Sequence, residues 1–122
     1  MTEKHILVVD DEFGIVEVLT GALGDHGYHV VPAYNGEQAL ARIADQRPAL
    51  AVVDYMMPVS GGRHLLEVLS SGECADIPVI LISSADESAV RGSGAKYRVF
   101  LRKPFRLVAI LEAVEALIGK PG

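Results

Sequence analysis

Four charged side chains stand directly after short apolar runs, and together they could support phosphoryl or metal chemistry. They are Asp10 and Asp11 after residues 5–9, Asp54 after residues 50–53, and Lys103 after residues 99–102. An apolar run that stops at a charge indicates a buried strand whose carboxyl end emerges at a polar edge. In open α/β sheets, ligands bind at that edge. We therefore predict a compact site for a divalent cation and a phosphoryl group.

The charges of this predicted site define its chemistry. Several carboxylates at one strand edge repel one another, and the repulsion raises the pKa of at least one of them until a cation binds. Mg²⁺ suits such a site, because it takes one or two carboxylates and keeps waters and phosphate oxygens as its other ligands. Asp54 could then act as a nucleophile on phosphorus. The Lys103 ammonium would offset charge on the phosphoryl oxygens, and the Ser83 hydroxyl could donate a hydrogen bond to them.

Strand and helix patterns alternate along the chain and would position these residues. Apolar runs predict strands at 5–9, 28–31, 50–53, 79–82 and 98–102. Helical spacing predicts helices at 14–24, from the N-cap Asn35 to just before Pro48, around 65–69, and from about 105 to 118. We expect a loop over residues 57–62.

Two of the predicted helices have a clear apolar face. In the first helix it comprises Ile15, Val18, Leu19, Ala22 and Leu23, and in the last helix Leu107, Val108, Leu111, Val114 and Leu117. Residues 85–97 are harder to assign, because Gly92 and Gly94 disfavour a helix by about 1 kcal/mol each. We expect a short or mobile fourth helix there.

Five strands alternating with five helices imply an α/β fold with a doubly wound parallel sheet covered on both faces. We predict the strand order 2-1-3-4-5, which places the first and third strands side by side. That adjacency would bring Asp10 and Asp11 next to Asp54.

Size and composition bound the possible functions. The 122 residues provide one core, half of them are hydrophobic, and the formal net charge of -5 argues against a nucleic-acid or anionic-membrane surface. The single cysteine, Cys74, excludes an intrachain disulfide and fits a reducing cytoplasm, and the four histidines show no metal-ligand spacing. Neither a signal peptide nor a membrane span is predicted. We expect one domain over residues 1–119, with residues 120–122 as a tail or the start of a linker.

Over essentially its whole length the sequence resembles the receiver domains of two-component response regulators. This resemblance implies a flavodoxin-like fold. The matching segments are 8–12 (Val-Val-Asp-Asp-Glu), 53–58 (Val-Asp-Tyr-Met-Met-Pro) with Gly61, Ile82-Ser83, and 103–105 (Lys-Pro-Phe). No single segment is decisive, but their order and spacing together are highly specific.

The resemblance implies a role for each of these positions. Asp54 corresponds to the aspartate that a histidine kinase phosphohistidine phosphorylates. Asp10 and Asp11 correspond to the acidic pair that holds Mg²⁺, Asp11 directly and Asp10 largely through water. The backbone carbonyl of Met56 completes the protein ligands of the metal, together with Asp54.

The resemblance also implies the parts of a switch. Ser83 matches the switch hydroxyl, Phe100 the aromatic switch residue, and Lys103 the lysine that binds the phosphoryl group. The Lys103–Pro104 peptide is typically cis in this family. Phosphorylation would then change the surface of the fourth helix, fifth strand and fifth helix. In the family this surface mediates dimerisation or binding of an output partner.

The sequence departs from the family pattern between the switch hydroxyl and the lysine. Ser84 stands where alanine or glycine is common. The segment from Ser83 to Lys103 is about two residues shorter than usual, with Lys96 and Tyr97 where Gly-Ala is frequent. These departures bear on the fourth helix rather than on the phosphorylation chemistry.

Other interpretations of these residues remain open. Asp10 or Asp11 could cap the first helix, and Asp54 could be a solvated loop residue. The whole chain could be a degenerate receiver that acts only as a protein-interaction module. It could also be a Mg²⁺-dependent aspartyl-phosphate phosphohydrolase, although haloacid-dehalogenase-type phosphatases need an acid where Met56 stands. A flavin-binding protein lacks support, because no Ser/Thr-rich phosphate loop follows the first strand.

Overall fold

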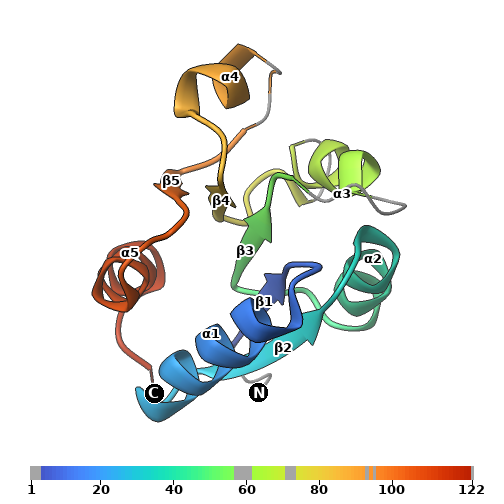
Figure 1. Cartoon of the computed structure of the whole chain (residues 1–122). Coiled ribbons are helices and arrows are strands. Elements are labelled where there is room, and N and C mark those ends of the chain that lie inside the picture. The colour runs from blue at the N-terminus through green and yellow to red at the C-terminus, as the bar shows by residue number, and fades with distance from the viewer. Residues whose placement is uncertain (1–3, 57–61, 71–73, 93, 95, 122) are drawn as a thin grey trace.

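The computed structural model describes residues 4–56, 62–70, 74–92, 94 and 96–121 (Figure 1). Strands and helices alternate in this part of the chain. The strands are β1 (His5–Val9), β2 (His29–Ala33), β3 (Leu50–Asp54), β4 (Val79–Ser83) and β5 (Val99–Arg102). The helices are α1 (Phe13–Asp25), α2 (Gly36–Asp45), α3 (Gly62–Leu69), α4 (Glu87–Gly92) and α5 (Leu107–Ile118).

The five strands form one parallel sheet in the order β2-β1-β3-β4-β5, which confirms the predicted topology. Figure 1 shows α1 and α5 on one side of the sheet and α2 and α3 on the other. Side chains from β1, β3 and β4 alternate between two apolar clusters, one under each pair of helices. Because these strands are buried on both faces, their sequences are continuous apolar runs.

Most predicted boundaries hold to within two residues. Asn35 caps α2 as predicted, since its side chain accepts a hydrogen bond from Gln38 N at 2.8 Å. The predicted end of the second strand is too early, because β2 continues through Pro32 to Ala33. An edge strand tolerates a proline, and β2 is an edge of this sheet. The predicted loop at 57–62 lies outside the described residues except for Gly62, which already belongs to α3.

The apolar faces of two helices differ from the prediction. Helical spacing places Val18, Leu107 and Val108 in the core, but they are 52%, 40% and 48% exposed. The buried positions include Val16 in α1 and Ile110 in α5. Both α1 and α5 carry apolar residues on more than one side, so the sequence pattern alone does not determine which of these residues face the sheet.

The fourth helix is short, as predicted. It spans six residues, and Val90 is its buried side chain. Two polar links join this region to β5 and to the segment just before it. The Tyr97 hydroxyl donates to Glu87 Oε2 at 2.8 Å, and Arg102 forms an exposed 2.7 Å ion pair with Asp86, just before α4. In Figure 1, α4 stands at the top of the molecule, beyond the carboxyl end of β4.

One histidine is buried at the amino end of the sheet. His5 begins β1 and is 2% exposed, and its Nδ1 has no hydrogen-bond partner among the residues that the structure describes. Its ring lies edge-on to that of His29 with a centroid separation of 6.3 Å. Burial, and then the neighbouring His29, lower the pKa of His5.

In the described part of the chain, no helix combines the length and apolar character that crossing a bilayer requires.

Candidate functional site

The carboxyl ends of β1 and β3 lie side by side, because these two strands pair in parallel. Asp10 follows β1 and Asp54 is the last residue of β3, and both are buried. Asp11 and Glu12, which follow Asp10 in the sequence, are exposed. One carboxylate oxygen from each of these four residues lies within 4.8 Å of the other three. The structure therefore gathers the predicted acidic residues at one edge of the sheet.

The same local hydrogen bond occurs at three strand ends. In each case a side-chain oxygen accepts from the backbone N–H two residues later, which turns the chain away from the sheet. The three bonds run from Glu12 N to Asp10 Oδ1 at 2.9 Å, from Met56 N to Asp54 Oδ1 at 3.0 Å, and from Ala85 N to Ser83 Oγ at 3.0 Å. Each aspartate thus uses Oδ1 for the backbone and keeps Oδ2 for the site.

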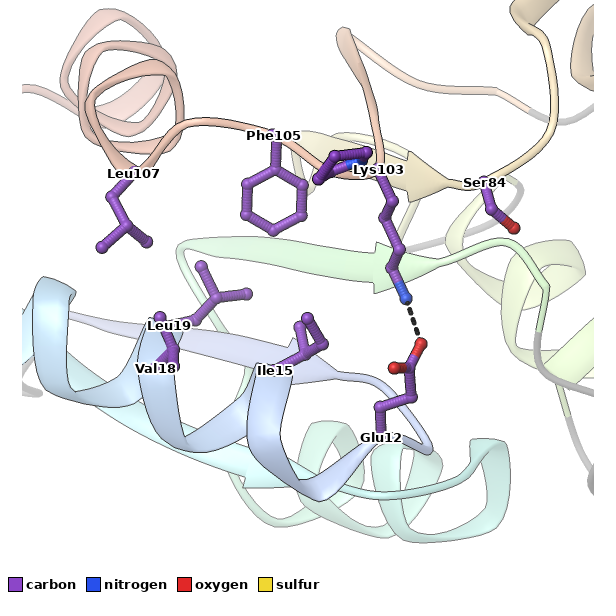
Figure 2. Close-up of a pocket in the computed structure, with 9 residues that line it drawn as sticks. Glu12, Ile15, Val18, Leu19, Ser84, Lys103, Phe105 and Leu107 are labelled. Carbon is purple, nitrogen blue, oxygen red and sulfur yellow. Dashed lines mark hydrogen bonds and ion pairs between the residues drawn. The ribbon is translucent and has the colours of Figure 1, made fainter.

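Lys103 comes to these oxygens from the end of β5. Its backbone N–H donates to Ser83 O at 2.7 Å, and its peptide bond with Pro104 is cis. The side chain is 14% exposed and runs toward Glu12 (Figure 2). From Lys103 Nζ the distances are 2.9 Å to Asp10 Oδ2, 2.9 Å to Glu12 Oε1 and 3.3 Å to Asp54 Oδ2. One ammonium therefore serves three carboxylates.

Burial and the neighbouring charges both shift the pKa of Asp10 and of Lys103. Burial raises the pKa of Asp10, and the Asp54 carboxylate adds to that effect, whereas the Glu12 backbone N–H and Lys103 reduce it. For Lys103, burial alone would lower the pKa. The Asp10, Glu12 and Asp54 carboxylates outweigh burial, and the pKa of Lys103 is raised well above its ordinary value. Lys103 is therefore a permanent cation at neutral pH.

The residues at this edge fit a hard divalent cation. The donors are carboxylate oxygens, which Mg²⁺ and Ca²⁺ prefer. Asp10 Oδ2 is buried and has no hydrogen bond, since its 2.9 Å contact with Lys103 is an ion pair without hydrogen-bond geometry. A buried oxygen with unused acceptor capacity favours a further positive partner.

The two predicted switch residues lie on neighbouring strands. Ser83 is fully buried at the end of β4, next to the site. Phe100 is half-buried in β5, pairs in register with Leu81, and packs against the cluster under α2 and α3. Its ring lies 5.9 Å from the ring of Tyr97. Tyr97 thus lies between Phe100 and α4: its ring is next to the Phe100 ring, and its hydroxyl is bonded to Glu87 of α4.

Glu12 has no predicted role, yet it contacts Lys103 as closely as Asp10 does. The signal in the sequence is the run of three acids from Asp10 to Glu12, of which only the first two are predicted as site residues. Asp10 and Asp11 do not cap α1, the alternative interpretation of this pair. The N-cap position is Glu12, which makes no side-chain capping bond.

A groove of about 490 Å³ opens beside Lys103 (Figure 2). Its polar lining comes from Glu12, Ser84 and Lys103. The apolar lining comes from α1, from the segment between β5 and α5, and from the first residue of α5, and comprises Ile15, Val18, Leu19, Pro104, Phe105 and Leu107. The exposed side chains of Val18 and Leu107 therefore line a groove next to the acidic site.

A 2-1-3-4-5 parallel sheet with two aspartates and a largely buried lysine at one strand edge defines a receiver-type module. The family model described as the response regulator receiver domain matches residues 6–115. The chain therefore belongs to the response regulator receiver family. This confirms both the predicted fold and the predicted family.

Curated relatives agree with this assignment. The chain is 38% identical over 128 residues to the phosphate regulon transcriptional regulatory protein PhoB of Pseudomonas aeruginosa, an alignment that covers all of this chain and 56% of PhoB. It is 37% identical over 119 residues to the response regulator MprA of Mycobacterium avium, with 95% of this chain and 51% of MprA covered. The chain thus spans about half the length of these relatives.

Solved structures share the fold over nearly the whole chain. The receiver domain of NtrX from Brucella abortus has a TM-score of 0.82 and 32% identity, covering 93% of this chain and 97% of that one. The chemotaxis response regulator CheY4 of Vibrio cholerae has a TM-score of 0.83 and 25% identity, covering 96% and 100%.

Proposed function

We propose that Asp54 accepts a phosphoryl group from the phosphohistidine of a sensor histidine kinase or phosphotransfer protein, and that this step switches an output. The observation that carries the proposal is the asymmetry of the Asp54 carboxylate. Oδ1 is held by Met56 N at 3.0 Å, and Oδ2 lies 3.3 Å from the Lys103 ammonium. One oxygen is fixed, and the other is next to the charge that a phosphoryl group needs.

In this proposal Asp54 Oδ2 attacks phosphorus and forms the new P–O bond. The P–N bond of the phosphohistidine breaks, and its electron pair returns to the imidazole nitrogen. Lys103 stays protonated and offsets negative charge on the phosphoryl oxygens. The side chains of Asp10, Asp11 and Asp54 and the Met56 carbonyl would hold Mg²⁺, which would supply further positive charge to those oxygens.

The switch would start from Ser83. Its hydroxyl now accepts a hydrogen bond from Ala85 N, and its own proton is available to a phosphoryl oxygen. Movement of Ser83 would let Phe100 turn inward, which shifts the population of the α4-β5-α5 surface between two states. That surface would then pair with a second receiver or bind an output partner. The domain would make no direct contact with nucleic acid.

The proposal covers residues 1–119 as the receiver unit, with residues 120–122 as a tail or the start of a linker. We also propose that the domain acts in the cytoplasm. The module would take part in its own phosphorylation and autodephosphorylation. A purely protein-interacting receiver would not need the ion-paired Lys103 beside Asp54. A phosphohydrolase is disfavoured because Met56, not an acid, stands two residues after Asp54.

Asp54→Asn tests the proposal directly. We expect acetyl phosphate with Mg²⁺ to add one phosphoryl group to the wild-type chain and none to Asp54→Asn, as read by intact-mass spectrometry. Asp86→Asn is the matched control, because it makes the same chemical change at an exposed aspartate away from the acidic cluster. Equal labelling of the wild type and Asp54→Asn would contradict the assignment.

A further inference from the structure

We infer that Glu12 is a positioning residue that holds the Lys103 ammonium at the mouth of the site, in competition with a phosphoryl group on Asp54. The inference deepens the proposed function and rests on it. Glu12 would thereby set how readily the site accepts and keeps a phosphoryl group.

The position of Glu12 points to this role. It is the N-cap residue of α1, where a short polar side chain commonly accepts a hydrogen bond from the helix. The Glu12 side chain makes no such bond. It reaches instead to Lys103 Nζ at 2.9 Å, a contact between residues 91 positions apart in the sequence (Figure 2). The carboxylate is thus committed to the lysine rather than to its own helix.

The three carboxylates around Lys103 differ in freedom. The Asp10 and Asp54 side chains are 0% and 3% exposed, and each is anchored to the backbone through Oδ1. The Glu12 side chain is 62% exposed and contacts Lys103 from the solvent side. Glu12 can therefore leave the ammonium without a buried charge losing its partner, whereas Asp10 cannot.

A phosphoryl group on Asp54 Oδ2 would need Lys103 for its own oxygens. Glu12 Oε1 already occupies Lys103 Nζ at 2.9 Å. An incoming phosphoryl group must therefore displace Glu12 from the ammonium, which offsets part of its attraction to Lys103. Removing the Glu12 charge should strengthen binding of a phosphoryl mimic.

Two alternative roles for Glu12 predict different results. Glu12 belongs to the cluster that could hold a cation, and replacing a metal ligand would weaken Mg²⁺ binding. Alternatively, Glu12 could simply repel an anion, and then its charge alone would matter. Glu12→Asp separates this last case, because aspartate keeps the charge but is one methylene too short to reach Lys103 in the same way.

The experiment measures the affinity of the full chain for beryllofluoride, a phosphoryl mimic, at saturating Mg²⁺. We expect Glu12→Gln and Glu12→Asp to bind it about two- to fivefold more tightly than the wild type, as expected for loss of an exposed ion pair. The dissociation constant for Mg²⁺ alone, followed by NMR titration, should stay unchanged. Glu17→Gln is the matched control, because it removes the same charge from an exposed position of the same helix outside the cluster.

Each outcome decides between these three roles. Unchanged beryllofluoride affinity in Glu12→Gln, or wild-type affinity in Glu12→Asp, would overturn the positioning role. Weaker Mg²⁺ binding in Glu12→Gln would assign Glu12 to the metal instead and overturn it as well. Failure of the wild-type chain to bind beryllofluoride would count against the proposed function itself, so the two failures are distinguishable.

Discussion

The ion pairs of two consecutive residues, Arg102 and Lys103, lie in two contrasting regions of the molecule. One region is the exposed surface near α4, and the other is the buried carboxyl edge of the sheet. Lys103 lies at the carboxyl edge of the sheet with a side chain 14% exposed, beside the buried carboxylates of Asp10 and Asp54. Arg102 turns to the surface near α4, where its side chain is 60% exposed and its partner Asp86 is 67% exposed. The Arg102 ion pair, at 2.7 Å, is shorter than each of the three that Lys103 Nζ makes.

Distance alone therefore does not measure what an ion pair contributes. Solvent screens the Arg102–Asp86 pair and competes for both partners, so its net contribution is small. At the edge of the sheet, Lys103 is the cation beside two carboxylates that water scarcely reaches. Removing it would leave buried charge without compensation, which is the costly case.

The largest expected effect is that of Lys103→Met. We expect it to lower the free energy of unfolding by about 3 kcal/mol at pH 7, because Asp10 and Asp54 lose their counter-charge. Arg102→Met, the same kind of change one residue earlier, should cost less than about 0.5 kcal/mol. Urea unfolding of both variants measures the difference. Equal losses would remove the distinction between the two regions.

A smaller effect is expected at the opposite end of β1, where His5 is buried without a charged partner. Because folding lowers the pKa of His5, the unfolded chain takes up its proton first as pH falls. His5 should therefore cost stability as the pH drops below about 6.5, the ordinary pKa of the unfolded histidine.

His5→Leu tests this by removing the titrating ring. The difference in unfolding free energy between pH 7 and about pH 5.5 should be smaller in His5→Leu than in the wild type. Equal pH dependence in the wild type and His5→Leu would show that protonation of His5 is not opposed by the fold.

The smallest expected effect is that of Tyr97→Phe in the α4 region. The variant loses the hydroxyl that donates to Glu87 but keeps the ring beside Phe100. We expect a global loss of about 0.5 kcal/mol, as for one partly exposed hydrogen bond. Amide hydrogen exchange should accelerate within α4 more than in β1 or β3, because α4 has few other anchors. Unaltered exchange in α4 would show that Val90 and the core alone hold the helix.

The sequence predicts the sheet well because each central strand is buried on both faces. Under that condition a strand is a continuous apolar run, and its end is marked by the first charge, as at Asp10 and Asp54. Parallel pairing then brings those ends together without any knowledge of side-chain conformation. The acidic edge of the site is predictable for this reason.

Contacts that depend on side-chain direction are not predictable in this way. The reach of Glu12 to Lys103 joins α1 to the end of β5, and no local pattern encodes it. Helical periodicity likewise places Val18, Leu107 and Val108 in the core, although the sheet covers the neighbouring stripe of each helix. In both cases the sequence lacks information on how a helix or strand is rotated about its axis relative to its neighbours.

The pairing of Lys103 with residues near the start of the chain also has a consequence for folding order. Asp10 and Asp54 have already emerged from a ribosome, with β1 and β3 able to pair, when the lysine that neutralises them is still to be synthesised. The carboxylates at the sheet edge lack this counter-charge until β5 docks, because Lys103 lies 91 positions after Glu12 and 49 after Asp54.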